Sequence, residues 1–147
     1  MSRLLLINGP NLGLLGQRQP EVYGRTTLEE IETRLTALAE ERGHELHCYQ
    51  NDAEHELLRQ IHAAREHEID LILMNPAAFT HTSIVLRDAL LAVGVPFIEI
   101  HLSNVSARED FRQTSFFSDI AIGTVAGFGV TSYELALIAA ERYLSAA

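Results

Sequence analysis

Apolar and polar positions follow two different periods along this chain. Short apolar runs bounded by turn residues are typical of buried strands, and they lie at about 3–8, 45–50, 70–75, 96–101 and 119–125. Between these runs, apolar residues recur every three to four positions, which is typical of helices with one buried face. This second pattern predicts helices at about 27–43, 53–67, 83–93 and 131–144, with a short helical turn at 107–112.

The regular alternation of strand and helix predicts the fold class. Five strands, each followed by a helical segment, favour a parallel sheet covered on both faces, because right-handed crossovers place helices on its two sides. We expect a three-layer α/β sandwich of the flavodoxin-like class, with strand order 2-1-3-4-5. A length of 147 residues with 47% hydrophobic residues fits a single domain that spans residues 1–147.

Net charge and the length of the apolar runs narrow the choice of partners. The chain carries 11 basic and 20 acidic residues, a net charge of −9, which repels nucleic-acid phosphates. Its apolar runs are far shorter than the roughly 18 residues that a membrane span requires, and its first residues lack the pattern of a signal peptide. We therefore expect a cytoplasmic protein that binds a small molecule, with neither nucleic acid nor membrane as partner.

All 11 basic residues are arginine, and the chain contains no lysine. A Schiff base requires a lysine amine, and a Walker-type phosphate loop requires its lysine, so imine chemistry and nucleotide hydrolysis of that type are excluded. The single cysteine, Cys48, allows no disulfide within the chain. Any catalysis therefore depends on tyrosine, histidine, arginine, asparagine and carboxylate side chains.

Polar residues gather where three of the predicted strands end. These segments are Asn8–Asn11, Asn75–His81 and Glu99–Asn104. In open parallel sheets, ligands bind beyond the carboxyl ends of the strands, at the point where the strand order reverses. The pattern therefore predicts a binding site formed by these three segments at one edge of the sheet.

The segment between the first strand and the first helix is unusually long. It runs from Gly9 to about Arg25, some 17 residues, whereas such loops usually have about 2–6 residues and longer ones are typically lids or binding loops. It contains Arg18 and Tyr23. A guanidinium close to a phenol favours the phenolate and lowers the pKa of the tyrosine from about 10. We therefore interpret Tyr23 as a candidate general base activated by Arg18.

The fourth predicted strand carries the second half of the candidate chemistry. Alternation places Phe97, Glu99 and His101 on one face of the strand. A carboxylate that binds one ring nitrogen of a histidine supports the imidazolium, and the second nitrogen is then able to protonate a leaving hydroxyl. We expect Glu99 to orient His101 in this way, with His81 at the exit of the neighbouring strand.

The sequence contains no His-x-His or His-Glu-x-x-His pair, so we expect no metal site. The five remaining histidines fall on predicted helix faces, the second strand or their edges, and they are interpreted as surface residues: His44, His47, His55, His62 and His67.

Four segments together resemble the type II 3-dehydroquinate dehydratase family. They are INGPNLGLLGQRQPEVYG at 7–24, NPAAFTHTSIVLRDAL at 75–90, IEIHLSNVSAREDFR at 98–112 and AGFG at 126–129, and the resemblance covers essentially the whole chain. It implies a flavodoxin-like subunit of a dodecamer, a tetramer of trimers. The implied reaction converts 3-dehydroquinate to 3-dehydroshikimate without a cofactor.

The resemblance also assigns roles to individual residues. Tyr23 matches the general base, Arg18 the residue that lowers its pKa, and His101 the general acid. Asn11 matches the residue that holds a water against the enolate, and Glu99 the residue that orients His101. The remaining matches are to substrate contacts: Asn75, His81 and Arg112 for ring hydroxyls, Leu102 and Ser103 for the carboxylate, and Asp88 presented by a neighbouring subunit.

Some features leave alternatives open. Asn51, Asp52 and Asp119 depart from the usual pattern of the family and put the shape of their loops in doubt. A flavodoxin-like module without catalysis, either a flavin carrier or a receiver domain, is the competing class, although a receiver needs an aspartate where Asn75 stands. Another cofactor-free lyase acting on a related hydroxy acid is the alternative among enzymes. The sequence does not distinguish aromatic biosynthesis from quinate breakdown.

Overall fold

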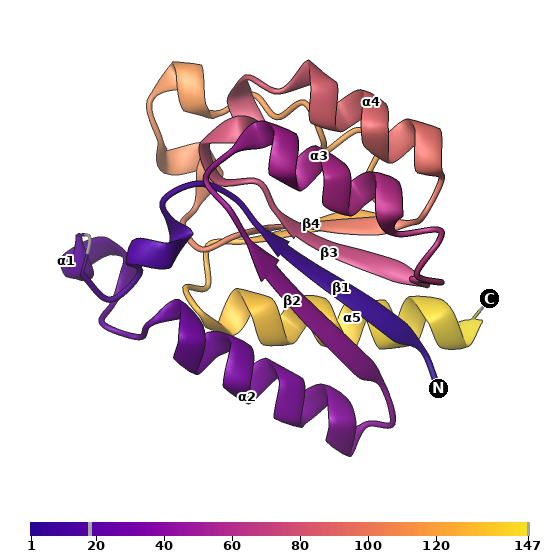
Figure 1. The fold of residues 1–147 in the computed structure, drawn as a ribbon. Coiled ribbons are helices and arrows are strands. Elements are labelled where there is room, and N and C mark those ends of the chain that lie inside the picture. Colours follow the sequence, from indigo (N-terminus) through magenta and orange to yellow (C-terminus); the bar gives the residue numbers. More distant parts are fainter. Residues whose placement is uncertain (18, 147) are drawn as a thin grey trace.

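The computed structural model describes residues 1–17 and 19–146, without the side chains of Val22 and Tyr23. Within this part of the chain, a five-stranded parallel sheet has the order β2-β1-β3-β4-β5 (Figure 1). Its strands are β1 (Arg3–Asn8), β2 (Glu45–Gln50), β3 (Leu71–Asn75), β4 (Phe97–His101) and β5 (Gly123–Ala126). The predicted flavodoxin-like topology is confirmed.

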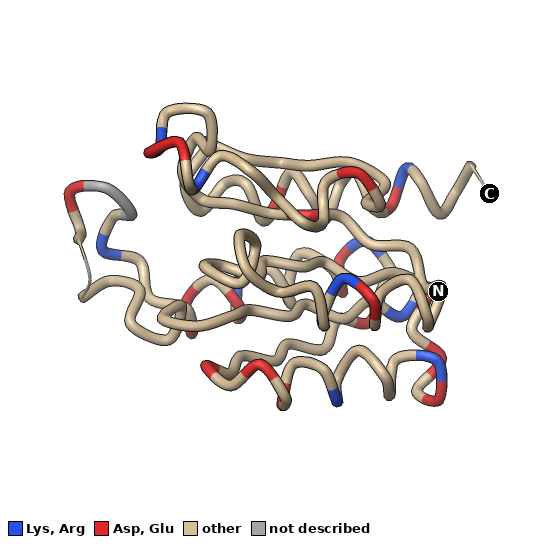
Figure 2. The backbone as a smooth tube through the Cα atoms, turned by 90° about the horizontal axis from the view of Figure 1, so that it is seen from above, with Lys and Arg blue, Asp and Glu red and all other residues tan. Residues whose placement is uncertain are grey.

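Helices cover both faces of the sheet. One layer contains α2 (Leu28–Glu41) and α5 (Thr131–Ala146), and the other contains α3 (Glu54–Ala63) and α4 (Ile84–Val93), as Figure 1 shows. The shorter elements are η1 (Leu12–Leu14), α1 (Pro20–Tyr23), η2 (Ala77–His81), η3 (Val105–Ala107) and η4 (Asp110–Arg112). Acidic and basic residues lie mostly along the helices and connecting segments (Figure 2).

Two apolar cores, one on each side of the sheet, hold these layers together. Strand β1 supplies both, because Leu4 and Leu6 face the core under α2 and α5 while Leu5 and Ile7 face the core under α3 and α4. This double burial explains why the central strands read as continuous apolar runs. In the described residues, none of the helices is long and apolar enough to cross a membrane.

Side-chain caps fix where two of the helices begin. The Thr27 hydroxyl accepts a hydrogen bond from the Glu30 amide at 3.2 Å, as the Thr-x-x-Glu spacing predicts for a capping box. Ser83 caps α4 in the same way and accepts from the Leu86 amide at 3.0 Å. Helix α4 therefore begins shortly after η2, the segment that follows β3 at the edge of the sheet.

Three predicted boundaries were wrong. The fifth strand begins at Gly123 rather than near 119, because the amides of Ile120 and Ala121 turn back to the Phe117 carbonyl at 3.1 and 3.0 Å. Helix α3 ends at Ala63 rather than near 67, where the chain turns and the Ile69 amide donates to the Ala64 carbonyl at 2.9 Å. The turn predicted at 107–112 is divided into the two 3-10 helices η3 and η4.

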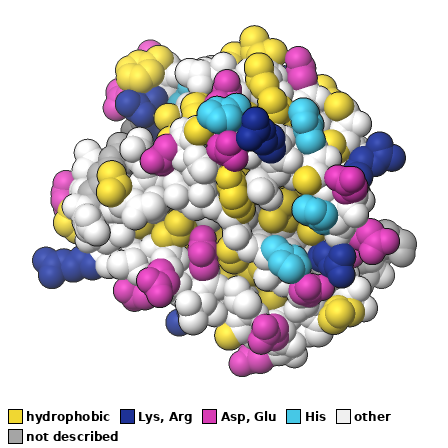
Figure 3. Space-filling model, viewed as in Figure 1, with side chains coloured by type: hydrophobic (Ala, Val, Ile, Leu, Met, Phe, Trp, Pro, Cys, Tyr) yellow, Lys and Arg dark blue, Asp and Glu magenta, His cyan; other side chains and the backbone are white. Residues whose placement is uncertain are grey.

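The surface histidines were predicted correctly with one exception. His47, His55, His62 and His67 are exposed, and Figure 3 shows histidine side chains gathered on the surface around α3. His44 instead is largely buried, with 12% of its side chain exposed, and its Nε2 lies 2.9 Å from Glu141. The prediction failed here because the contact joins α5 to the turn before β2, which no local pattern reveals.

Glu141 also pairs with Arg42, and the pair connects the end of α2 to α5. The guanidinium donates from Nε at 2.9 Å and from its terminal nitrogen at 2.7 Å to the two carboxylate oxygens. Hydrogen bonds from Arg42 and then His44 lower the pKa of Glu141 from 4.5 to about 2. A depressed pKa means that the ionised carboxylate is favoured in the folded state, so this stabilisation is lost as the pH falls from about 4.5 towards 2.

We predict that Glu141→Gln lowers the free energy of unfolding at neutral pH, and that its difference from the native chain shrinks below pH 4.5. Urea unfolding at a series of pH values measures this difference. Glu41→Gln, an exposed glutamate near the end of α2, is the matched control and is expected to show no such trend. A difference that stays constant down to pH 2 would contradict the account.

Candidate active site

A cavity of about 530 Å³ opens at the carboxyl end of the sheet. Its walls come from segments 10–15, 75–81 and 101–112, which follow β1, β3 and β4. They overlap the three predicted segments, Asn8–Asn11, Asn75–His81 and Glu99–Asn104, and the first and third extend beyond the predicted bounds. The cavity therefore lies where the strand order reverses, beside the central strands β1 and β3.

Most of the predicted site residues line this cavity. They are Asn11, Asn75, His81, His101, Leu102, Ser103 and Arg112. Asp88 lies exposed on α4 and does not contribute to the cavity wall within this chain. The predictions for Arg18 and for the side chain of Tyr23 fall outside the described residues, although the backbone of Tyr23 ends α1.

The backbone beside Asn11, which lines the cavity, is tightly packed at the edge of the sheet. The Gly9 amide donates to the Asn75 carbonyl at 2.8 Å, which brings the segments after β1 and β3 together. A Cβ atom on Gly9 would lie 2.5 Å from the Pro76 carbonyl oxygen, so only glycine fits this approach. Asn11 follows with φ 67°, a left-handed conformation that asparagine tolerates.

Asn51 and Asp52, which follow β2 and depart from the usual pattern of the family, form hydrogen bonds at the same wall of the cavity. The Asp52 carboxylate accepts the Asn11 amide at 2.9 Å and the Gln50 side-chain amide at 3.1 Å. The Asn51 side chain accepts the Ala53 amide at 2.8 Å just before α3 begins. Asp52 therefore holds the backbone of Asn11 in place. Asn51 and Asp52 thus shape the loop after β2 through hydrogen bonds.

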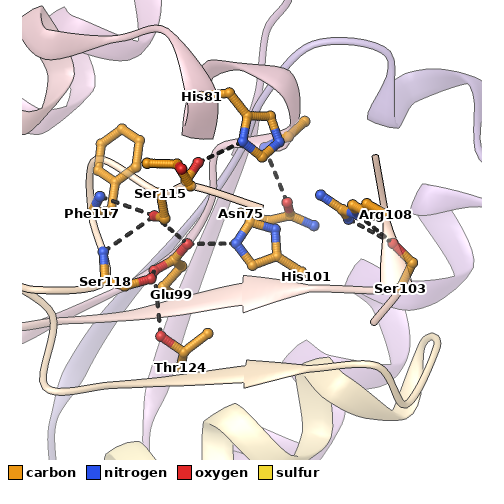
Figure 4. A network of polar contacts seen from close by, with 12 residues as sticks. Asn75, His81, Glu99, His101, Ser103, Arg108, Ser115, Phe117, Ser118 and Thr124 are labelled. Carbon is orange, nitrogen blue, oxygen red and sulfur yellow. Dashed lines mark hydrogen bonds and ion pairs between the residues drawn. The ribbon is translucent and has the colours of Figure 1, made fainter. Parts of the chain in front are cut away.

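His101 and Glu99 form a buried pair on one face of β4, as alternation along the strand predicted (Figure 4). His101 Nε2 lies 2.5 Å from Glu99 Oε2, with 2% and 1% of the two side chains exposed. Burial raises the pKa of Glu99, but hydrogen bonds from His101, Ser118 and Ser115 outweigh burial and hold that pKa below its usual range. The carboxylate is therefore ionised and able to support an imidazolium.

Three hydroxyl groups that the sequence analysis missed also contact Glu99. Ser115 Oγ donates at 2.8 Å, Ser118 Oγ at 2.5 Å and Thr124 Oγ1 at 3.3 Å, and Figure 4 shows them around the carboxylate. The only local signal was a pair of serines three positions apart ahead of the fifth strand. Such a pair is common in turns, so it does not by itself indicate a contact with a distant strand.

Arg108 is a further residue that the sequence analysis missed. Its guanidinium donates from Nε and from a terminal nitrogen to Ser103 Oγ, at 3.0 and 2.6 Å. Both lone pairs of the Ser103 hydroxyl are thereby used, so its hydrogen is available to a ligand in the cavity. Arg112, which was predicted, instead donates to Glu109 at 2.6 Å and lies over the Phe111 ring.

His81 and Asn75 complete the wall, and hydrogen bonds fix the direction of each side chain. His81 Nδ1 lies 2.7 Å from the Thr114 carbonyl, which accepts only, so Nδ1 carries a hydrogen. Asn75 Nδ2 donates to the Tyr133 hydroxyl at 2.9 Å, and Tyr133 in turn donates to Asn8 at 2.6 Å. Burial raises the pKa of Tyr133, which makes this tyrosine a neutral structural group and no candidate base.

The described side chains include the groups that proton transfer requires. Among them, no group of three or more histidine, cysteine, aspartate or glutamate residues is arranged to hold a metal ion. The cavity instead combines a histidine backed by a carboxylate with amide, hydroxyl and guanidinium donors. Such a set is suited to binding a polyhydroxylated acid and giving a proton to a leaving oxygen.

The close approach at Gly9 gives a test of the scaffold. Gly9→Ala forces a methyl group against backbone, so we expect a loss of about 1–3 kcal/mol in the free energy of unfolding. Gly123→Ala is the matched control, because nothing lies within 4 Å of its added Cβ, and its effect should stay within about 0.5 kcal/mol. Urea unfolding compares the two, and equal stabilities would show that this contact does not constrain the site.

Known proteins resemble this chain along nearly its whole length. The family model described as dehydroquinase class II matches residues 2–141. A 3-dehydroquinate dehydratase of Teredinibacter turnerae is 59% identical over 98% of this chain and 94% of its own length. One from Xanthomonas euvesicatoria is 62% identical over 93% of both chains.

Solved structures show the same likeness. The type II dehydroquinase of Propionibacterium acnes matches with a TM-score of 0.92 and 40% identity, over 97% of both chains. That of Butyrivibrio crossotus matches with a TM-score of 0.93 and 35% identity, over 95% of this chain and 97% of its own. Sequence and structure agree along nearly the whole length, and the chain therefore belongs to the class II dehydroquinase family.

Proposed function

We propose that this chain removes water from 3-dehydroquinate to give 3-dehydroshikimate, by an anti elimination through an enolate and without a cofactor. The observation that carries the proposal is the buried Glu99–His101 pair, whose histidine faces the cavity at the sheet edge. Membership of the class II dehydroquinase family supports the choice of substrate.

The elimination needs a base and an acid. In the proposal, the Tyr23 phenolate, stabilised by Arg18, removes the C2 proton next to the ketone, and the electrons pass to the ketone oxygen as an enolate. The side chain of Asn11, which lines the cavity, stabilises that charge through a bound water. His101 then protonates the C1 hydroxyl, which leaves as water while the enolate forms the carbon–carbon double bond.

Substrate binding uses the remaining polar wall of the cavity. In the proposal, Asn75, His81 and Arg112 bind the ring hydroxyls, and Ser103 with the backbone amides of residues 102–103 binds the carboxylate. The two hydrogen bonds from Arg108 to Ser103 support this assignment, because they orient the hydroxyl hydrogen away from the guanidinium and place a positive charge beside the carboxylate site.

We also propose that the chain assembles into a dodecamer, a tetramer of trimers, in which Asp88 reaches the site of a neighbouring subunit. The exposed position of Asp88 on α4 supports this, because the same helix exposes 58% of Ile84, 48% of Val85 and 55% of Leu91. An apolar patch of this kind is typical of a protein contact.

The role of Tyr23 has a direct test. Purified native protein is given 3-dehydroquinate, and the ultraviolet absorbance of the conjugated product is followed. We expect Tyr23→Phe to lower kcat by about 10²–10⁴-fold with little change in KM, because only the base is lost. Tyr143→Phe, on the exposed side of α5, is the control and should retain native turnover. Near-native turnover by Tyr23→Phe would remove this residue as the base.

Assembly is tested separately by light scattering of the native protein after size exclusion. The proposal requires a particle of about twelve times the chain mass of 16.4 kDa. Ile84→Glu places a charge in the exposed apolar face of α4 and is expected to reduce the particle size, because a charge buried in a contact is costly. A native protein that remains a single 16.4 kDa chain would contradict the assembly and the role of Asp88 together.

A further inference from the structure

The Glu99 carboxylate receives hydrogen bonds at every position that it offers. His101 and Ser115 lie against Oε2 at 2.5 and 2.8 Å, and Ser118 and Thr124 lie against Oε1 at 2.5 and 3.3 Å (Figure 4). An ionised carboxylate has about four such positions, whereas a protonated one must use one oxygen as a donor. The three hydroxyls donate to acceptor positions of Glu99, and these bonds stabilise its ionised form.

Ser115 shows the direction of its hydrogen bond most clearly. Its hydroxyl oxygen accepts the amides of Phe117 and Ser118, at 3.0 and 3.2 Å. A hydroxyl has one hydrogen and two lone pairs, so the hydrogen of Ser115 points to Glu99. Ser115 has no lone pair left with which to accept a proton from Glu99, and the turn at 115–118 is matched to the ionised carboxylate.

This turn is held from its outer side by α4. The Arg87 guanidinium donates to the Phe116 carbonyl at 2.8 Å and to both oxygens of Asp119, at 2.5 and 2.9 Å. Asp119, the third departure from the family pattern, therefore anchors the segment that carries the two serines. The hydroxyls lie between Glu99 and solvent, since Ser118 and Thr124 are exposed while Glu99 is fully buried.

We propose that Ser115 and Ser118 are positioning residues for the general acid, which keep Glu99 ionised and directed at His101 so that the proton stays on the imidazole. The inference rests on the proposed role of His101 as the acid. Without the two hydroxyls, the buried carboxylate loses stabilisation and takes the proton that His101 would give to the leaving hydroxyl.

The other charged and titratable side chains near His101 and the turn at 115–118 are directed at partners other than Glu99. On the cavity side of His101, the other titratable or charged side chains of the described wall are His81, Arg108, Glu109 and Arg112. Arg108 donates to Ser103, and Arg112 donates to Glu109. His81 contacts the Thr114 carbonyl. Arg87 is directed to Asp119 at the outer end of the turn. Glu99 itself contacts His101 and the hydroxyl groups of Ser115, Ser118 and Thr124.

The first test compares kinetics of the assembled enzyme. We expect Ser115→Ala and Ser118→Ala each to lower kcat about 10- to 100-fold with KM nearly unchanged, since the acid is affected and the binding wall is not. Ser118→Thr keeps the hydroxyl at an exposed position and should restore most of kcat. Ser106→Ala, an exposed serine in η3, is the matched control and should behave as native.

The second test measures the protonation of Glu99 without any turnover. Infrared spectroscopy separates the carbonyl stretch of a protonated carboxyl group from the bands of carboxylates. At neutral pH we expect this stretch in Ser115→Ala/Ser118→Ala, its absence in the native protein, and its removal when Glu99→Gln is added to the double variant. If the double variant does not fold, Ser118→Ala alone serves, because Ser118 is exposed.

The outcomes separate the two proposals. A native protein that does not convert 3-dehydroquinate overturns the proposed function, while the infrared band still decides whether the serines keep Glu99 ionised. Native kcat in both alanine variants overturns the positioning role, whatever the infrared spectrum shows. A loss of kcat that Ser118→Thr does not restore, or that comes without the protonated band, overturns it as well.

Discussion

A carboxylate buried against a histidine is the interaction on which the rest of this structure depends. Removing an ionised group from water is costly unless hydrogen bonds replace the lost hydration. Glu99 is wholly buried and still has a pKa held below its usual range, because His101 and the hydroxyls around it together outweigh the burial. The strand β4, the turn at 115–118 and the cavity above them are arranged around this one charge.

The fold supplies the geometry that this pair requires. Parallel strands end at the same edge of the sheet, so the segments after β1, β3 and β4 meet around one cavity. Gly9 allows two of these segments to touch, and the Tyr133 hydroxyl ties Asn8 to Asn75 beneath them. The cavity floor is thus polar and is tied together by hydrogen bonds.

The alternation of strands and helices led to the sheet order, the Thr-x-x-Glu spacing to the cap at Thr27, and the two-residue period of a strand to the shared face of Glu99 and His101. It failed for the start of β5, for His44 and for the residues that hold the site, Ser115, Ser118 and Arg108. Their roles come from contacts between segments that only the fold brings together, such as Ser115 with a strand 16 positions earlier. The roles given to Tyr23 and Arg18 remain predictions, made from the long segment after β1 and from the family resemblance.

The central claim is that the shared proton of this buried pair resides on the histidine and that the carboxylate remains ionised. Neutron diffraction from a crystal of the native protein at neutral pH locates that proton directly, as deuterium. The account predicts deuterium on the ring nitrogen of His101 that faces Glu99 and none on either oxygen of Glu99, with the Ser115 and Ser118 deuterium atoms pointing to the carboxylate. Deuterium bound to a Glu99 oxygen would contradict it.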